Sequence, residues 1–299
     1  MTTNPRVPFS LSSQRAPIAP PPGGGLIVHI VVNIESWRFD HPMPRKLLPA
    51  PHGAEAVPDV PNFAWAEYGM RCGMPRLFES LSRRALPVTC AFNAGVIDNY
   101  PTLAQAVLDA GWEVMGHGLH QKALTAEDGE AALIGEAIAK IAAFTGKPVA
   151  GWLGPGLRQS SETLDILAAA GVRYCCDWLL DDLPFWMRTA SGPMIGIPYS
   201  LEINDSVIYA VEKHSSREIF ERLETTIATF APEIAAGQPR ILTIGMHPHL
   251  IGAPHRFFWF ERMLDLLVER DDASFMTGSQ IADWFETAGD PAEKAEVAS

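Results

Sequence analysis

Carboxylate and imidazole side chains recur where short apolar runs of the sequence end. Glu35 follows the run Leu26–Asn33, His117 lies between two glycines, and His247 ends another run and precedes a proline. A carboxylate can act as a general base in hydrolysis, and an imidazole as a general acid or base. These three residues are therefore the first candidates for catalysis.

Further polar and aromatic residues lie near the same run ends. Trp37, Trp152 and Trp178 could supply the flat apolar walls of a pocket for a small molecule. His249, two residues after His247, could form another part of the wall. The complete set of substrate-binding candidates at these ends is Asn33, Trp37, Gln121, Trp152, Pro155, Trp178 and His249.

Glu67 and Arg71 form a charged pair at the start of a predicted helical segment. An arginine fork can bind the polar groups of a substrate in a bidentate way. The same spacing of four residues also lets the two side chains pair with each other on a helix, which stabilises it by about 0.2–0.5 kcal/mol. Both readings stay open, and we include the two residues among the substrate-binding candidates.

The elements that must position these residues alternate regularly along the chain. We expect strands at 26–33, 88–92, 112–116, 149–153, 172–176, 194–198, 241–246 and 273–276. We expect helices at 69–85, 102–110, 126–145, 161–170, 216–231, 257–269 and 280–285. This alternation predicts parallel strands with right-handed crossovers, closed into a (β/α) barrel. A doubly wound sheet is disfavoured because no glycine fingerprint follows the first strand. In a barrel the carboxyl ends of the strands share one mouth, so the candidates would converge there.

The chain is expected to form one domain at 26–286. Residues 1–25, rich in Pro, Ser and Gly, predict an irregular arm, and residues 287–299 a flexible tail. The Pro-rich stretch 38–66 has no helical or strand period and predicts a long loop at the active site.

Composition restricts the class of protein further. The 299 residues are 47% hydrophobic and carry a formal net charge of −12, which argues against disorder and against nucleic-acid binding. The apolar runs are too short to span a bilayer, and no basic region followed by an apolar stretch opens the chain. The four cysteines show no metal-site spacing, so we expect reduced thiols and a cytoplasmic protein. The apolar residues Phe257, Phe258 and Trp259 suggest a homo-oligomer, with a place in the core as the alternative.

Seven segments, in order, resemble the polysaccharide deacetylase (NodB-homology) superfamily over about 26–286. These are residues 32–35, 67–73, 110–113, 151–152, 181–186, 196–199 and 245–252. They look most like the branch that contains the metal-independent allantoinase and the cyclic-imide hydrolases. The resemblance implies a distorted (β/α)7-type barrel that hydrolyses amide bonds. It also implies that Glu35 is the general base, that His247 protonates the leaving nitrogen, and that Asp177 orients His247. His117 would stabilise the oxyanion together with backbone amides.

The departures from the family pattern concern its metal site. Ser36 stands where the family has an aspartate ligand, and Gln121 where it has the second of two histidines spaced four apart. Zinc generally requires about three strong protein ligands and a water. We therefore expect no metal or other cofactor, with zinc bound through His117 and His120 as the alternative. The family's arginine before two prolines is also missing at Leu153–Pro155, where Arg71 or Arg158 could replace its charge.

Three functions compete at this point. The first is ring opening of a small cyclic amide, ureide or imide, with no nucleic-acid or membrane partner. The second is metal-dependent deacetylation of an N-acetylated sugar polymer, which would need the full set of ligands and an open groove. The third is a catalytically inactive barrel used for binding, which has no need for Glu35, His117 and His247.

Overall fold

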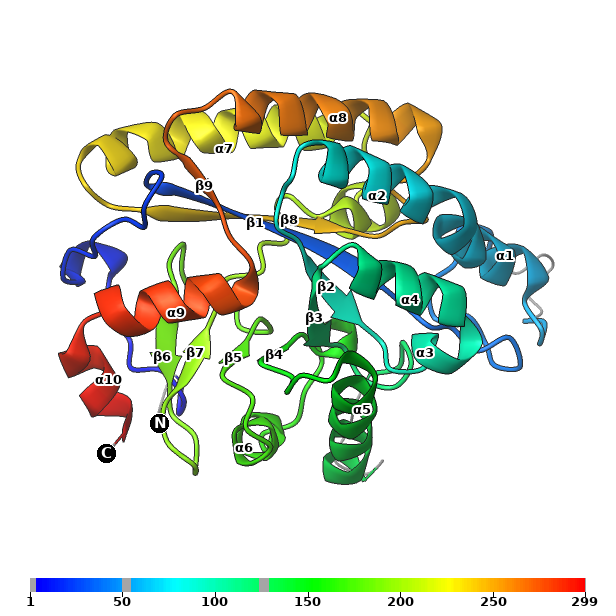
Figure 1. The fold of residues 1–299 in the computed structure, drawn as a ribbon, viewed down its shortest axis with the longest axis horizontal. Helices are drawn as coiled ribbons and strands as arrows, with labels where there is room; N and C mark the ends of the chain where they lie inside the picture. The colour runs from blue at the N-terminus through cyan, green and yellow to red at the C-terminus, as the bar shows by residue number, and fades with distance from the viewer. Residues whose placement is uncertain (1–3, 50–54, 124–128, 299) are drawn as a thin grey trace.

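A curled sheet of mostly parallel strands forms the centre of the fold (Figure 1). The computed structural model describes residues 4–49, 55–123 and 129–298. Its strands are β1 (Leu26–Ile34), β2 (Thr89–Phe92), β3 (Glu113–Gly116), β4 (Gly151–Trp152), β5 (Tyr174–Cys175), β6 (Phe185–Met187), β7 (Met194–Gly196), β8 (Arg240–Met246) and β9 (Ala273–Phe275). Their order in the sheet is β6-β7-β5-β4-β3-β2-β1-β8, and β9 pairs with β1 off this path.

All neighbouring strands from β7 to β8 along this order are parallel, and only β6 joins in an antiparallel way. The two ends of the sheet approach each other through irregular segments. The Ile241 amide donates to the Asp182 carbonyl at 2.9 Å, and the Gly245 amide donates to the Ile203 carbonyl at 3.0 Å. The predicted distorted (β/α) barrel in a single domain is confirmed, in the form of a strongly curled sheet.

Helices pack on both apolar layers of this sheet, most of them on the outer one. They are α1 (Val60–Tyr68), α2 (Met74–Arg83), α3 (Val96–Asn99), α4 (Pro101–Asp109), α5 (Glu130–Thr145), α6 (Thr163–Ala169), α7 (Glu218–Ala235), α8 (Pro254–Val268), α9 (Gly278–Ala288) and α10 (Pro291–Ala298). α7 and α8 run side by side over β1 and β8 (Figure 1). No helix in the described part of the chain is long and apolar enough to cross a membrane.

The side chains of β1 alternate between two apolar layers, as a strand's period of two requires. Leu26, Val28, Ile30, Val32 and Ile34 belong to the layer between the sheet and the helices. Ile27 and Val31 belong to the layer inside the curled sheet. All nine residues of β1 are buried, as the continuous apolar run predicted. The alternate residues that face the inside of the sheet continue with Asn33 and Glu35. Polar groups therefore follow the apolar core at the carboxyl end of β1.

Several predicted boundaries are corrected by the structure. The predicted loop 38–66 is shorter, because α1 begins at Val60, with Pro61 compatible with its first turn. The strand β6 was not predicted; its three residues are too few to show a period. The predicted helix 126–145 is described from Glu130, and residues 126–128 lie outside the described residues.

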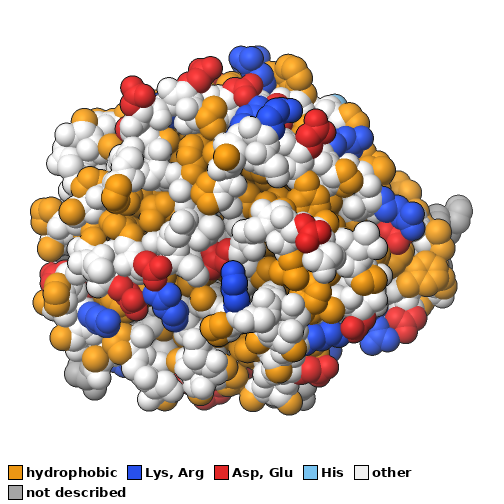
Figure 2. All heavy atoms as spheres, viewed as in Figure 1, with side chains coloured by type: hydrophobic (Ala, Val, Ile, Leu, Met, Phe, Trp, Pro, Cys, Tyr) orange, Lys and Arg blue, Asp and Glu red, His pale blue; other side chains and the backbone are white. Residues whose placement is uncertain are grey.

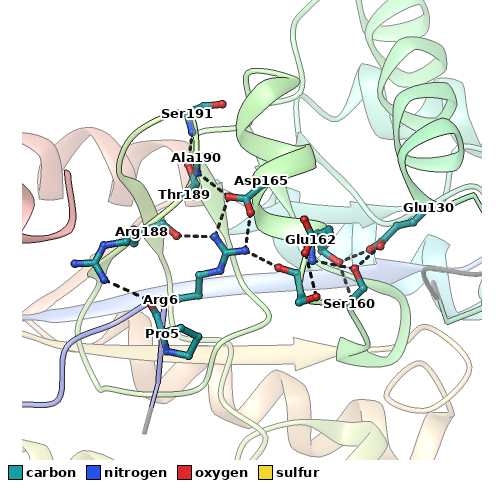
Figure 3. A network of polar contacts seen from close by, with 12 residues as sticks. Pro5, Arg6, Glu130, Ser160, Glu162, Asp165, Arg188, Thr189, Ala190 and Ser191 are labelled. Atoms are coloured by element: carbon teal, nitrogen blue, oxygen red, sulfur yellow. Dashed lines mark hydrogen bonds and ion pairs between the residues drawn. The ribbon is translucent and has the colours of Figure 1, made fainter. Parts of the chain in front are cut away.

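The predicted flexible tail is also corrected, because it contains α10. Val297 on this helix is buried against the inner apolar layer, and the Lys294 ammonium lies 4.5 Å from the centre of the Trp186 ring. The N-terminal arm is irregular as predicted, but it is held by arginines. Arg6 binds both carboxylate oxygens of Asp165 at 2.7 and 2.8 Å and also donates to the Arg188 carbonyl (Figure 3).

Charged side chains of both signs are mixed on one face of the molecule. Lys and Arg side chains lie among Asp and Glu side chains on the face shown in Figure 2, where they form no continuous basic area. The four cysteines are free, and only Cys72 among them is exposed.

Candidate active site

Three predicted catalytic side chains meet at the carboxyl end of β1. The Glu35 carboxylate is buried, with 4% of its surface exposed. Its Oε1 atom lies 3.5 Å from His247 Nε2 and 4.0 Å from His117 Nε2. Parallel strands bring these ends together, since β8 pairs with β1 and β3 is joined to β1 through β2. The structure therefore places a carboxylate between two imidazoles, as the strand ends predicted.

Asp205 holds His247 in place from the opposite side of its ring. Asp205 Oδ1 lies 2.7 Å from His247 Nδ1, and Oδ2 accepts from the backbone amides of His247 at 2.8 Å and Ile251 at 3.0 Å. Asp205 is fully buried. Because the carboxylate accepts from Nδ1–H, the other ring nitrogen, Nε2, is directed at Glu35. The result is a continuous row from Asp205 through His247 to Glu35.

The charges in this row reinforce one another. Burial disfavours the charged form of both His247 and Glu35, but their mutual attraction outweighs it. Asp205 and Glu35 raise the pKa of His247 to about 9. His247 in turn lowers the pKa of Glu35 to about 2. Near neutral pH the row therefore contains an imidazolium ion between two carboxylates.

His117 has a different protonation state from His247. Its Nδ1 atom lies 2.5 Å from the Leu153 carbonyl, which can only accept, so Nδ1 carries the hydrogen. Burial lowers the pKa of His117 despite the nearby Glu35, so the ring is neutral at pH 7. Nε2 is then an acceptor with a free lone pair. This corrects the role expected for His117, because a neutral ring in this tautomer cannot donate a hydrogen bond to an oxyanion.

A small cavity lies beside Glu35. It measures about 200 Å³ and is lined by Asn33, Ile34, Glu35, Trp37, Ala66, Met70, Pro248 and His249. Trp37 and His249 thus lie where the sequence predicted pocket walls. The His249 ring packs edge-on against Trp65, with ring centres 4.7 Å apart. Burial lowers the pKa of His249 to about 3, so this wall is neutral.

Free polar atoms point to where a ligand would bind. Within the described ranges, Glu35 Oε2, His117 Nε2 and His249 Nε2 are buried and have no hydrogen-bond partner. An unsatisfied buried polar atom costs about 1–3 kcal/mol, so native proteins rarely leave such atoms together. Their concentration around one carboxylate is typical of a site that completes its hydrogen bonds with a substrate.

The residues that replace the family's metal ligands bind to one another. Ser36 Oγ accepts from Asn99 at 2.9 Å, while its amide donates to Asn93 at 2.8 Å. Gln121 donates its backbone amide to the Ser36 carbonyl at 3.0 Å. His120 Nδ1 lies 3.3 Å from Ser36 Oγ. Among the residues that the structure describes, no three His, Cys, Asp or Glu side chains are grouped to hold a metal ion. The donor set therefore does not fit a family-type metal centre.

Asp177 does not orient His247, contrary to the expectation from the resemblance. Its Oδ1 atom accepts from the Gly154 amide at 2.6 Å, and burial raises its pKa to about 7. Asp177 therefore binds the loop after β4 and not His247. Asp205, in the connection between β7 and α7, takes the position at the imidazole.

Two predicted pocket tryptophans lie elsewhere. Trp152 is fully buried in the layer between sheet and helices, and its ring lies over Gly116. Trp178 lines a separate surface pocket together with Arg6 and Gln159. Pro155 is buried and packs beside Gly118, so it supports the His117 loop and does not line the cavity.

Glu67 and Arg71 pair with each other along the helix, with Arg71 Nε 3.5 Å from Glu67 Oε2. The Arg71 side chain is 73% exposed. The glycines of the same stretch face the site. A Cβ atom on Gly69 would lie 2.2 Å from the His249 amide nitrogen, and one on Gly73 would lie 2.1 Å from the Pro248 carbonyl. Residues two apart lie about half a turn from each other on a helix, so the charged pair lies on the face opposite the glycines.

Three site residues were missed as functional candidates. Asp205 and Asn204 interrupt an apolar stretch between Ile203 and Ile208, and buried polar residues flanked by apolar ones were the available signal. Tyr199 lies in a segment that carried the resemblance, but no role followed from it. Its hydroxyl accepts from Asn33 at 2.8 Å and from Asn204 at 3.1 Å, which ties the β1 end to the Asp205 segment.

The chain is similar in sequence to polysaccharide deacetylases. Residues 66–175 match the polysaccharide deacetylase family model. The predicted resemblance to the polysaccharide deacetylase superfamily is confirmed. One relative is a Schizosaccharomyces pombe (strain 972) protein that is provisionally named as a polysaccharide deacetylase. It is 25% identical to this chain over 235 residues, which cover 72% of this chain and 73% of the relative.

Two solved structures share the whole architecture. The crystal structure of PuuE allantoinase superposes with a TM-score of 0.84 at 24% identity, covering 96% of this chain and 99% of the other, and shows a shared fold. The structure of a probable polysaccharide deacetylase from Pseudomonas aeruginosa PAO1 has a TM-score of 0.77 at 26% identity, covering 89% and 93%. The family match and the similarity to the two polysaccharide deacetylase relatives support a hydrolase of C–N bonds of the deacetylase type.

Proposed function

We propose that the protein opens the ring of a small cyclic amide, ureide or imide by general acid–base hydrolysis. The observation that carries this proposal is the row Asp205–His247–Glu35, in which Glu35 lines a small cavity. The row contains a base, an acid and the carboxylate that holds the acid in position.

Water is activated between two acceptors in the proposed reaction. Glu35 Oε1 and His117 Nε2 are 4.0 Å apart, a span that one water molecule can bridge by donating a hydrogen to each. The oxygen lone pair of this water then faces the substrate carbonyl. Glu35 takes one proton as the new C–O bond forms.

His247 completes the reaction as the acid. Its imidazolium Nε2–H donates a proton to the ring nitrogen as the C–N bond breaks. The opened chain then has a carboxylic acid at one end and the N–H group of an amine, amide or urea at the other. Asp205 keeps the imidazolium oriented during this transfer. The proton that Glu35 has gained then returns to His247, which restores the starting state.

The size of the cavity favours a small ring over a polymer. Its empty space, part of which is open to solvent, measures only about 200 Å³. Trp37 and Met70 provide apolar walls beside the carboxylate, which suits a compact planar molecule. An acetylated sugar chain needs an open groove on both sides of the reacting unit.

Metal-dependent deacetylation of a polysaccharide or peptidoglycan is the second candidate. The family match and the similarity to the probable polysaccharide deacetylase of P. aeruginosa favour it. The hydrogen bonds of Ser36 and Gln121 argue against it, because they leave His117 without the family's partner ligands.

A substrate panel with chelation tests the proposal. Purified protein is incubated with allantoin, hydantoin, succinimide and N-acetylglucosamine oligomers, and ring opening and acetate release are measured separately. We expect opening of at least one ring, no acetate release, and the same rate after EDTA treatment. Acetate release that EDTA abolishes and zinc restores would establish the second candidate instead.

A further inference from the structure

Asn33 lies beside the catalytic carboxylate on the inner face of the sheet. Asn33 and Glu35 are two residues apart, share this face and both line the cavity. Asn33 is buried, with 2% of its surface exposed. Because the cavity is small, a substrate that reaches Glu35 also contacts Asn33.

Two hydrogen bonds fix the orientation of the Asn33 amide. Its Nδ2 atom donates to the Tyr199 hydroxyl at 2.8 Å and to the Met246 carbonyl at 3.0 Å. A backbone carbonyl can only accept, so the end of the amide that faces Met246 is the NH₂ group and not the oxygen. Asn204 donates to the same Tyr199 hydroxyl at 3.1 Å, which holds that partner in place. A flip of the Asn33 amide would set two oxygen atoms against each other.

The oxygen end of the Asn33 amide is left as an acceptor. Both Nδ2 hydrogens are used, and no described residue donates a hydrogen bond to Oδ1. Glu35 Oε2 and His249 Nε2 also lack partners in the described ranges. The Glu35 carboxylate, however, acts on water in the proposed reaction, and no described group fixes whether His249 Nε2 carries a hydrogen. Asn33 Oδ1 is therefore the neutral acceptor of the cavity whose orientation is fixed.

The proposed reaction offers this acceptor a matching donor. When the C–N bond of an unsubstituted amide or imide breaks, the nitrogen receives a proton from His247 on its lone pair and keeps its own N–H. Asn33 is bound to the carbonyl of Met246, the residue directly before His247, so both side chains start from the same end of the sheet. An acceptor that holds the N–H fixes the rotation of the ring and hence the direction of the nitrogen lone pair. An alkyl group in place of this hydrogen would leave a buried acceptor unpaired.

We propose that Asn33 is a specificity-determining residue that accepts a hydrogen bond from the N–H group of the scissile amide. The substrates of this site are then rings whose reacting nitrogen carries a hydrogen, and rings alkylated at this nitrogen are excluded. This inference rests on the proposed function for its ring substrate. The hydrogen bond itself does not require a ring, because a secondary acetamide presents the same N–H group.

Two substrates that differ by one methyl group test the hydrogen bond. The kcat/KM values of wild type are measured for succinimide and N-methylsuccinimide and are divided by the rates of the uncatalysed reactions. We expect a preference for succinimide of at least tenfold, because the methylated ring leaves Oδ1 unpaired. If wild type opens another ring of the panel, that ring is compared with its form methylated at the released nitrogen. Equal values for the two members of the pair would overturn the proposal.

Asn33→Leu separates the hydrogen bond from exclusion by size, because leucine removes Oδ1 without opening space in the cavity. We expect this variant to lose at least tenfold in kcat/KM for succinimide and to show a preference within threefold of unity. A preference that persists in Asn33→Leu would mean that bulk alone excludes the methyl group, and would overturn the proposal. Asn33→Val, with a residue that suits a strand, is used if Asn33→Leu does not give the wild-type circular dichroism spectrum.

Tyr199→Phe is the matched control for a structural role of Asn33. It removes the hydroxyl that holds the Asn33 amide but leaves Oδ1 and the bond to Met246. We expect a lower rate with the preference for succinimide retained. Loss of the preference in Tyr199→Phe to the same extent as in Asn33→Leu would show that the scaffold carries the effect, and would overturn the proposal.

The wild-type substrate panel distinguishes failure of this inference from failure of the proposed function. If wild type releases acetate but opens no ring, the proposed function fails. Asn33 is then tested by acetate release from N-acetylglucosamine oligomers and from their forms methylated at the amide nitrogen. If wild type performs neither reaction, binding of succinimide and N-methylsuccinimide is measured by calorimetry. Tighter binding of succinimide that is lost in Asn33→Leu supports the inference, while equal binding or no binding by wild type overturns it.

Discussion

Replacing Asp205 by asparagine tests the row on which the proposed chemistry depends. Asp205 contacts His247 Nδ1 at 2.7 Å and also accepts from two backbone amides. Asparagine keeps the size of the side chain but removes its charge, and one of its two polar atoms becomes a donor facing donors. The variant therefore loses both the attraction for the imidazolium and the fixed orientation of the ring.

The magnitude follows from the protonation of His247. Its pKa lies at about 9 against an ordinary value of 6.5, a preference for the imidazolium of about 3 kcal/mol that Asp205 and Glu35 share. Breaking a buried pair by removing one partner costs about 3–5 kcal/mol of stability. Because general acid catalysis contributes about 10²–10⁴-fold, kcat/KM should fall by at least 10²-fold.

The assay compares Asp205→Asn with Asp177→Asn on the substrate that wild type turns over. Asp177 is the matched control, because it is a partly buried acidic residue beside a backbone amide in the same barrel, without contact to His247. We expect the basic limb of the pH–rate profile near pH 9 in wild type and Asp177→Asn, and at least one unit lower in Asp205→Asn. NMR titration of His247 checks the same shift directly. An unchanged limb and more than a tenth of the rate in Asp205→Asn, with inactivation of Asp177→Asn, would refute the reasoning.

Three further predictions follow from the same geometry. Glu35→Gln should abolish hydrolysis while the fold persists, and retention of more than about a tenth of the wild-type rate would contradict its role as base. The stability contributed by His247 is fully present below its unfolded pKa of about 6.5 and is lost as the pH rises through about 9, whereas that of Glu35 is lost only as the pH falls toward 2. Denaturant unfolding should therefore show a free energy of unfolding that is lower by up to about 3 kcal/mol at pH 9.5 than at pH 6. The difference should be much smaller in Asp205→Asn. Gly69→Ala should destabilise the protein by about 1–3 kcal/mol or more, because its Cβ would lie 2.2 Å from the His249 amide nitrogen, while Gly135→Ala in α5, where a Cβ meets nothing within 4 Å, should be neutral or stabilising by up to about 1 kcal/mol in thermal unfolding.

The sequence by itself determined the barrel and the meeting of Glu35, His117 and His247. Apolar runs separated by helical patterns require parallel strands, and parallel neighbours place their carboxyl ends at one edge. A residue at the end of such a run is therefore located in space by its position in the chain alone. The same reasoning predicted that both faces of β1 are buried.

Only the tertiary structure decided which carboxylate supports His247. Asp177 and Asp205 both lie at the carboxyl side of predicted strands, and nothing in their local sequence tells which one faces the imidazole. The choice depends on how the connection between β7 and α7 folds back over β8, where Asn204 pairs with Gly245. This contact joins residues about forty positions apart and leaves no period in the sequence.

The orientation of single side chains was likewise decided by tertiary packing. Trp152 belongs to a strand of two residues. A shift of one residue along such a strand moves its ring from the site to the outer layer, and the local sequence does not determine which of the two applies. The stretch from Glu67 to Gly73 contains charges that could bind a substrate, but its glycines are what the close approach of Pro248 and His249 requires. Local residue types show which groups can do chemistry, whereas the packing of distant segments determines which of them are close enough to do it.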